Sequence, residues 1–151
     1  MHISKTLAIA VAATFVTQVP VFAQTTCSDE TIAGRYAVHG QGWTGTATLE
    51  PLSPEVVVGT HYFDGKGTFT GSGYQSIAGL SRWFTTSGTY NVKPDCVITV
   101  EGTSTSPSAA GAHEVISWFG VVTDAGNKVY VIRIKDGATT STEYVRITPI
   151  D

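Results

Sequence analysis

Three histidines outside the first 23 residues, His39, His61 and His113, are the first side chains to consider, because three imidazoles can hold a catalytic zinc. They lie on three separate stretches, and no pair has the spacing of one helical turn. His113-Glu114 does not start a helical zinc motif, because Ser117 stands where the second histidine belongs. We therefore expect strand histidines that face solvent or form hydrogen bonds, and no metal site.

Hydroxyl and carboxylate side chains give no catalytic set. The segment Gly73-Tyr74-Gln75-Ser76-Ile77 lacks the strand-to-helix elbow that exposes a nucleophilic serine, and Ser117 lies inside an apolar run. Asp64 and Asp124 occupy matching places before glycine-containing turns, where a carboxylate accepts hydrogen bonds from the following backbone amides. We predict turns there rather than calcium sites, and we assign no catalytic residue and no cofactor.

The aromatic side chains are more informative about binding. They are spread over several predicted strands, and a barrel would bring such strands around one lumen. They form either a filled core or a pocket with an arginine as its polar anchor. Arg82 and Arg146 are alternative anchors, and Phe84 and Phe119 further wall residues. The predicted ligand-binding residues are Tyr62, Trp83, Tyr90, Trp118 and Arg133.

Two cysteines, Cys27 and Cys96, are present, and they stand 69 positions apart. Neither has further ligands nearby at zinc-site spacing, so a metal pair is disfavoured. In an oxidising compartment the pair is expected to form one disulfide.

The elements that would position these side chains are short strands. Ser28 and Asp29 can cap one helical turn that ends at Gly34, and alternating apolar residues with glycine-rich turns follow. Three hairpins are predicted, around 64–67, 94–95 and 123–128. Further strands are expected over 35–39, 43–49 and 82–85, and a closing strand over 144–147. The low-complexity segment 104–112 is predicted to be a mobile loop, either a plain connection or a flap at the barrel mouth.

Eight or nine strands in hairpin order favour an all-β, up-and-down antiparallel barrel, because closure leaves no exposed sheet edge. A β-sandwich is the alternative. An outer-membrane barrel is not expected, because stretches such as 68–73, rich in threonine, serine and glycine, cannot present an apolar band to lipid.

Residues 1–23 have the pattern of a secretory signal peptide: Lys5 precedes an apolar run that ends in Val21-Phe22-Ala23. Cleavage after Ala23 leaves one domain over 24–151 and no membrane span. Without Lys5 there are 8 basic against 12 acidic residues, a net charge of −4, which excludes a basic surface for nucleic acid. We expect a secreted or periplasmic protein.

Three motifs carry a resemblance to a known group: Gly34-x-Tyr36, Tyr62-Phe63-Asp64-Gly65-Lys66-Gly67, and Gly88-Thr89-Tyr90-x-Val92-x-x-Asp95-Cys96. The sequence resembles small, secreted, largely uncharacterised bacterial proteins with calycin-like barrels, similar to the allene oxide cyclase type. The shared residues are turn glycines and strand positions, so the resemblance implies an architecture and no catalytic set. A fainter similarity to avidins lacks their tryptophan-rich strands.

Three function classes follow. The first is a secreted barrel that binds a small apolar or aromatic molecule, which requires a lumen of roughly a few hundred Å³. The second is an exported protein-binding module, such as an inhibitor or a surface adhesion component, with a filled lumen and an exposed apolar patch. The third is a cyclase or isomerase, which requires a desolvated acid or base in the pocket.

Overall fold

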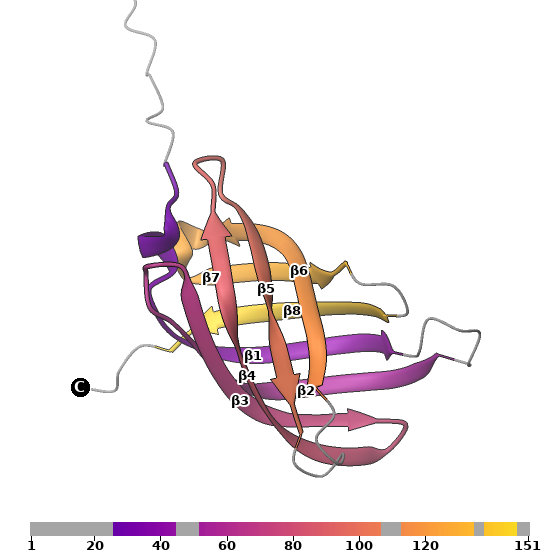
Figure 1. Cartoon of the computed structure of the whole chain (residues 1–151). Helices are drawn as coiled ribbons and strands as arrows, with labels where there is room; N and C mark the ends of the chain where they lie inside the picture. Colours follow the sequence, from indigo (N-terminus) through magenta and orange to yellow (C-terminus); the bar gives the residue numbers. More distant parts are fainter. Residues whose placement is uncertain (1–25, 45–51, 107–112, 135–137, 148–151) are drawn as a thin grey trace, which may run out of the picture.

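A computed structural model describes residues 26–44, 52–106, 113–134 and 138–147. Eight antiparallel strands form one closed barrel, in which each strand pairs with the next and β8 pairs with β1 (Figure 1). The predicted barrel is confirmed and the sandwich alternative is excluded. The elements are η1 (Asp29–Ile32), β1 (Gly34–Thr44), β2 (Ser53–Phe63), β3 (Thr68–Ile77), β4 (Leu80–Val92), β5 (Val97–Thr105), β6 (His113–Thr123), η2 (Asp124–Gly126), β7 (Lys128–Arg133) and β8 (Ala138–Arg146).

The strand count is eight because segments predicted separately are continuous. The strand predicted over 82–85 continues in β4 into the first strand of the hairpin predicted around 94–95. The strand predicted over 35–39 continues in β1 through Trp43. Residues 45–49 and 107–112 lie outside the described residues. The predicted loop at 104–112 begins later than expected, since β5 extends to Thr105.

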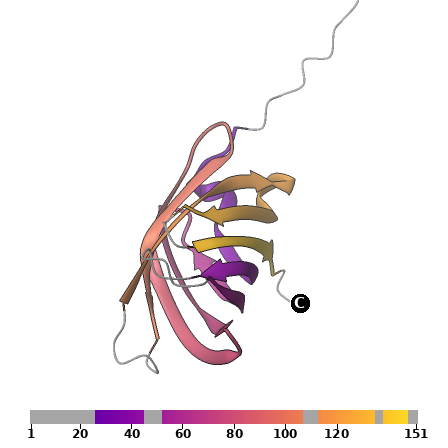
Figure 2. The ribbon, with the colours of Figure 1, turned by 90° about the vertical axis from the view of Figure 1, so that its right-hand side faces the viewer.

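Glycines allow the strands to bend around the narrow lumen (Figure 2). Gly59 of β2 faces Gly73 of β3, and a Cβ at these positions would lie 2.4 Å from the Ser72 carbonyl oxygen and 2.2 Å from the Val58 carbonyl oxygen. Neighbouring backbones approach each other too closely for any side chain at these points. The sheet can therefore curl tightly and close.

The Asp64 turn between β2 and β3 forms as predicted. One Asp64 carboxylate oxygen accepts hydrogen bonds from the backbone N–H groups of Lys66 (2.8 Å) and Thr68 (2.9 Å), and the other accepts one from the Thr68 hydroxyl (2.6 Å). These hydrogen bonds lower the pKa of Asp64 to about 2. Its carboxylate organises the turn.

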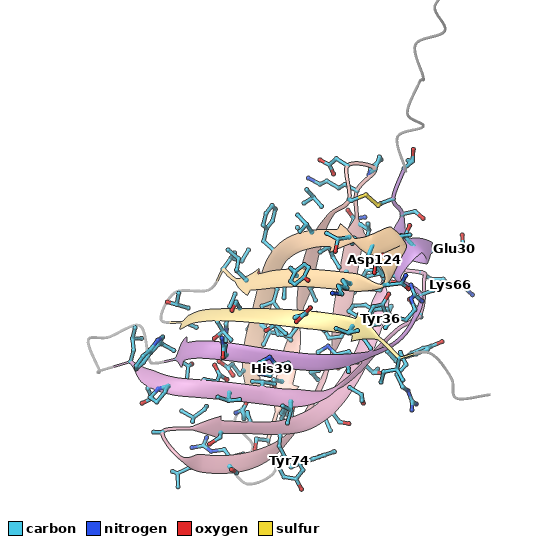
Figure 3. The ribbon with its side chains drawn as sticks, turned by 180° about the vertical axis from the view of Figure 1, so that it is seen from behind. Glu30, Tyr36, His39, Lys66, Tyr74 and Asp124 are labelled. Atoms are coloured by element: carbon cyan, nitrogen blue, oxygen red, sulfur yellow. A yellow bond between two sulfur atoms is a disulfide. The ribbon has the colours of Figure 1, made fainter. Side chains whose placement is uncertain are left out.

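One end of the barrel is closed by η1. Cys27, just before it, forms the predicted disulfide with Cys96, with 5.0 Å between the Cα atoms. The Asp29 carboxylate accepts a hydrogen bond from the Val92 N–H (2.6 Å), and Ile32 is fully buried. The labelled Glu30, Tyr36, Lys66 and Asp124 all lie toward this end of the barrel (Figure 3).

Arg146, at the end of β8, holds η1, the plug of this end, against the barrel. Its guanidinium donates hydrogen bonds to the carbonyls of Thr31 (2.9 Å), Gly126 (3.1 Å) and Ala33, and it lies 5.1 Å from the ring centre of Tyr36. The Tyr36 hydroxyl donates to the Gly126 carbonyl as well. Arg146 is therefore a structural residue of the closed end.

Aromatic rings fill the half of the lumen next to η1. The ring of Phe63 packs against Tyr36, Phe69, Tyr90 and Tyr144, with centroid separations from 5.0 to 5.9 Å. All five side chains are buried. This half of the barrel is a packed core.

Candidate functional site

The other half of the lumen contains a cavity of about 50 Å³ with polar and charged walls. Its lining side chains come from all eight strands, at positions that alternate with outward-facing ones. They are Val38, Glu55, Val57, His61, Gln75, Phe84, Thr86, Ser104, Glu114, Ile116, Trp118, Arg133, Thr140, Thr142 and Tyr144.

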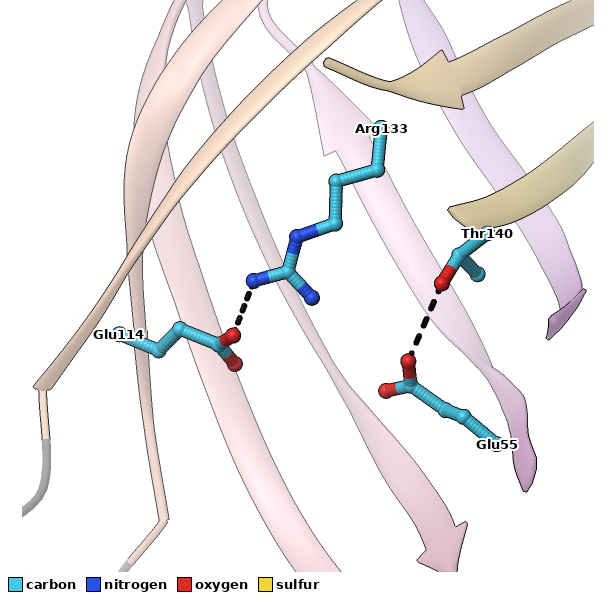
Figure 4. Close-up of polar contacts among 4 residues, drawn as sticks. All are labelled: Glu55, Glu114, Arg133 and Thr140. Carbon is cyan, nitrogen blue, oxygen red and sulfur yellow. Dashed lines mark hydrogen bonds and ion pairs between the residues drawn. The ribbon is translucent and has the colours of Figure 1, made fainter. Parts of the chain in front are cut away.

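A charged cluster lies at the mouth of this cavity, built on strand ends (Figure 4). Arg133, the last residue of β7, forms an ion pair with Glu114 of β6. Glu55 of β2 accepts a hydrogen bond from the Thr140 hydroxyl of β8 at 3.2 Å. The guanidinium lies between these two carboxylates in Figure 4.

The members of this cluster differ in burial. The Arg133 side chain is only 6% exposed, whereas that of Glu114 is 40% exposed; Glu55 is 5% exposed. Burial raises the pKa of Glu55, an effect partly opposed by the positive charge of Arg133 and the hydrogen bond from Thr140. Glu55 is thus a desolvated acid, as the cyclase hypothesis requires.

Deeper in the lumen, His61 lies among aromatic rings. It stacks on Trp118 with 6.0 Å between centroids and lies 5.2 Å from Tyr144. Its ring occupies the space over Gly71, where a Cβ would lie 2.1 Å from an imidazole carbon. Burial lowers the pKa of His61 to about 4, so the imidazole is neutral at neutral pH.

Three buried polar atoms on cavity-lining side chains have no hydrogen-bond partner among the described residues: His61 Nδ1, Arg133 Nε and the Tyr144 hydroxyl oxygen. Each such group costs about 1–3 kcal/mol if it is left without a partner. A cavity of about 50 Å³ has room for one or two water molecules, each of roughly 30 Å³ in the liquid, and these can serve the deeper groups.

A second hollow, of about 520 Å³, adjoins the cavity and shares Glu55, Arg133 and Thr140 with it. β7 ends at Arg133, and the pairing of β7 with β8 extends only to Ile132 and Ser141. The Arg133 side chain therefore lies where the inner cavity and the outer hollow meet. The hollow is also lined by Gln41, Gly42, Trp43, Pro54, Val56, Ile132, Thr139 and Ser141.

The structure places the five predicted binding residues in three different environments. Trp118 and Arg133 line the cavity, and Tyr90 is buried in the packed core beside the plug. Tyr62 and Trp83 point outward and are 51% and 42% exposed, so neither lines the lumen. Adjacent strand residues face opposite sides, and in each case the neighbouring phenylalanine faces inward instead.

The alternative wall and anchor residues are divided in the same way. Phe84 lines the cavity, whereas Phe119 is exposed on the outer face of β6. Arg146 lies at the closed end. Of the cavity-lining residues, the sequence analysis named only Phe84, Trp118 and Arg133 for binding, and it missed all the other ionisable ones: Glu55, His61, Glu114 and Tyr144. The spacing of Glu55, His61 and Phe63 by even numbers places them on one face of β2, but the sequence did not show that this face is internal.

The volume corrects one expectation. A lumen of roughly a few hundred Å³ was required for a fully enclosed ligand, whereas the inner cavity has about 50 Å³. Packed aromatic side chains occupy the remaining interior. The enclosed space therefore admits at most a small chemical group.

Among residues 26–44, 52–106, 113–134 and 138–147, no three His, Cys, Asp or Glu side chains are grouped so that they could hold a metal ion. His39 is exposed and His61 is internal, so these two do not converge. The described part of the chain contains no helix with the length and apolar character that a bilayer crossing requires.

No family model matches the chain, and no curated protein matches it. Two solved structures are similar to it. One is a redesigned beta barrel, mFAP1, bound to DFHBI, with 15% identity and a TM-score of 0.50, covering 82% of this chain and 100% of that one. The other is a redesigned beta barrel, mFAP0, also bound to DFHBI, with 19% identity and a TM-score of 0.45, covering 77% of this chain and 99% of that one. These similarities concern the fold.

Proposed function

We propose that this protein is an exported, non-enzymatic β-barrel that binds a small molecule at the mouth of its lumen. The observation that carries the proposal is that two buried charged side chains, Glu55 and Arg133, lie with Thr140 where the inner cavity meets the outer hollow. Buried charges are expensive unless they are fully paired, and incompletely partnered ones are typical of binding sites.

The two hollows suggest how a ligand is shared between them. A polar group fits the charged mouth of the inner cavity, and the rest of the molecule lies in the outer hollow of about 520 Å³. That hollow has the volume of an ordinary small-molecule site. The β-barrel mFAP1 binds DFHBI, so small-molecule binding is compatible with this architecture.

Binding is favoured over catalysis by the shape of the site. A cyclase of the allene oxide type acts largely by imposing a shape on its substrate, which requires an enclosing pocket. The inner cavity of about 50 Å³ cannot enclose such a substrate. Glu55, although desolvated, then acts in recognition.

The test uses two tryptophan variants of the outer surface. Trp43 lines the outer hollow and Trp83 does not, yet both are partly exposed. Saturation-transfer NMR with a mixture of benzylamine, benzyl alcohol and sodium benzoate should detect saturable binding to the wild-type chain. Trp43→Ala should reduce that binding at least several-fold, and Trp83→Ala should leave it unchanged. If none of the three compounds binds saturably, the proposal is overturned.

Export belongs to the same proposal. The signal-peptide pattern of residues 1–23 supports it, and the Cys27–Cys96 disulfide is compatible with an oxidising compartment. The expected N-terminus of the exported protein is Gln24. N-terminal sequencing of the processed chain would contradict this if it began far from that residue.

A second candidate function, recognition of a protein, is favoured by the outer face of β6 and β7. Phe119 pairs with Ile132 and Val121 pairs with Tyr130, and all four apolar side chains are 42–54% exposed. The variant Phe119→Lys/Tyr130→Lys, which changes no residue of the cavity or the outer hollow, should abolish an association made through this face and leave binding at the mouth intact. Sedimentation with and without a binding partner measures the first effect.

A further inference from the structure

The charges at the mouth of the lumen do not balance. The ionisable side chains that line the inner cavity are Glu55, His61, Glu114, Arg133 and Tyr144. His61 and Tyr144 are neutral at neutral pH, because burial lowers the pKa of the imidazole and raises that of the phenol. Two acidic side chains therefore face a single guanidinium, and burial raises the pKa of one of them, Glu55, so a cation beside it would favour its ionised form.

Arg133 does not neutralise both acids equally. Its terminal nitrogen is engaged by Glu114 in the ion pair, while Glu55 accepts one hydrogen bond, at 3.2 Å, from the neutral Thr140 hydroxyl. A carboxylate has about four acceptor positions. Glu55, at 5% exposure, is the acid that lacks a close cationic donor among the described residues.

The unpartnered groups show that the site is incomplete rather than a self-sufficient salt bridge. Arg133 Nε is buried without a partner, on a side chain that is 94% buried, and it belongs to the same cluster as Glu55. A purely structural ion cluster is normally hydrogen-bonded throughout, because half-paired buried charges lower stability. The Arg133 Nε–H requires a hydrogen-bond acceptor, whereas Glu55 has acceptor positions left over, so the cluster lacks polar partners of both kinds.

The outer hollow indicates what accompanies that group. Its wall next to Glu55 carries Trp43, Val56 and Ile132, which are 51%, 47% and 54% exposed. These apolar side chains line the same hollow as Glu55, which is shared between the hollow and the inner cavity. An apolar body would cover them, and an indole face also attracts cations.

We propose that the ligand is a small organic cation, an apolar amine whose ammonium group pairs with Glu55 while its hydrocarbon body lies against Trp43, Val56 and Ile132. This inference rests on the proposed function and specifies its ligand class. An anionic ligand meets two carboxylates and a guanidinium already engaged by Glu114. A neutral ligand leaves the excess charge of Glu55 in place.

The experiment compares three compounds that share one ring and differ in charge: benzylammonium, benzyl alcohol and benzoate. Dissociation constants are measured by NMR titration of the chain from Gln24 to Asp151 at pH 7.5. Benzylammonium should bind at least 10-fold more tightly than benzyl alcohol, and benzoate should bind most weakly.

The matched variants are Glu55→Gln and Glu143→Gln. Both remove one negative charge, but Glu143 lies on the outer face of β8 and does not line the mouth. Glu55→Gln keeps the shape and an acceptor for Thr140, and it should abolish the preference for benzylammonium over benzyl alcohol. Glu143→Gln should retain that preference. Thermal melting of both variants checks that the fold is kept.

The outcomes separate the two proposals. Equal binding of the amine and the alcohol, unaltered in Glu55→Gln, overturns the cation inference but leaves binding at the mouth in place. A preference for the amine that survives in Glu55→Gln also overturns the inference, because the charge would then be read elsewhere. If none of the three compounds binds, both the cation inference and the proposed function are overturned.

Discussion

The two ends of the barrel are built from similar side chains but differ in how completely their buried polar groups are hydrogen-bonded. At the closed end, Arg146 donates to the carbonyls of Thr31, Ala33 and Gly126, and Tyr90 both donates to and accepts from the backbone. At the mouth, Arg133 has one ion-pair partner and an unpartnered Nε, and in the cavity below it the Tyr144 hydroxyl has no partner among the described residues. Fully paired polar groups stabilise a fold, whereas partly paired ones are a cost that binding can repay.

The largest expected effect concerns the covalent link at the closed end. Replacing Cys27 and Cys96 by serine should lower the free energy of unfolding by about 4 kcal/mol, because a loop of 69 residues is no longer closed in the unfolded chain. Urea denaturation of the Cys27→Ser/Cys96→Ser variant and of the wild type measures this difference in the free energy of unfolding. The affinity at the mouth should be unchanged at temperatures where the variant is folded. A loss below about 1 kcal/mol would show that the plug does not depend on its disulfide.

A smaller effect is expected from His61, which lies between the two ends. Its pKa is about 4 in the folded protein against 6.5 when exposed, so between these values the unfolded chain binds more protons. The free energy of unfolding should be fully retained above pH 6.5 and should fall by about 3 kcal/mol as the pH drops to 4.

His61→Phe provides the control for this prediction, because it keeps an aromatic ring in contact with Trp118 and removes the titration. The acid-dependent loss over pH 6.5 to 4 should largely disappear in this variant. Glu55 acts in the opposite sense, since its raised pKa contributes stability at low pH that is lost as the pH rises through the folded value. An unchanged pH profile in His61→Phe would assign the acid sensitivity to other groups.

The smallest effect is expected from a pair of tyrosines that compares the closed end with the inner cavity. The Tyr90 hydroxyl accepts a hydrogen bond from the Gly65 N–H (2.8 Å) and donates one to the Asp29 carbonyl (3.2 Å). Tyr90→Phe should therefore cost about 1–2 kcal/mol. Tyr144→Phe removes a buried hydroxyl that has no partner, so stability should be unchanged or slightly increased. Chemical denaturation measures both variants. Equal losses in the free energy of unfolding would show that the two hydroxyls are hydrogen-bonded to the same extent.

The sequence was sufficient for the architecture because the relevant signals are local. Alternation of apolar residues gave the strands, and Asp64 with its glycines gave a turn that its own side chain organises. The pairing of Cys27 with Cys96 followed from there being two cysteines in a chain that the sequence predicts to be exported. Hairpins formed one after another then left closure as the way to remove sheet edges.

The site could not be predicted in the same way, because a strand pattern does not state which face is internal. Trp83 and Phe84 are both large and aromatic, and only the closed barrel decides that Phe84 lines the cavity while Trp83 faces outward. Glu55, Glu114 and Arg133 come from three strands that are far apart in sequence, and ordinary surface ion pairs have the same composition.

By itself, then, the sequence determined the all-β fold, the order of the hairpins and the disulfide. The tertiary structure alone decided that one half of the lumen is filled with rings and that the other half gathers two carboxylates and one guanidinium beside an outer hollow. The physical reason is that a β-strand specifies its side-chain alternation within a few residues. Which side chains meet across the lumen depends on the register and curvature of eight strands at once.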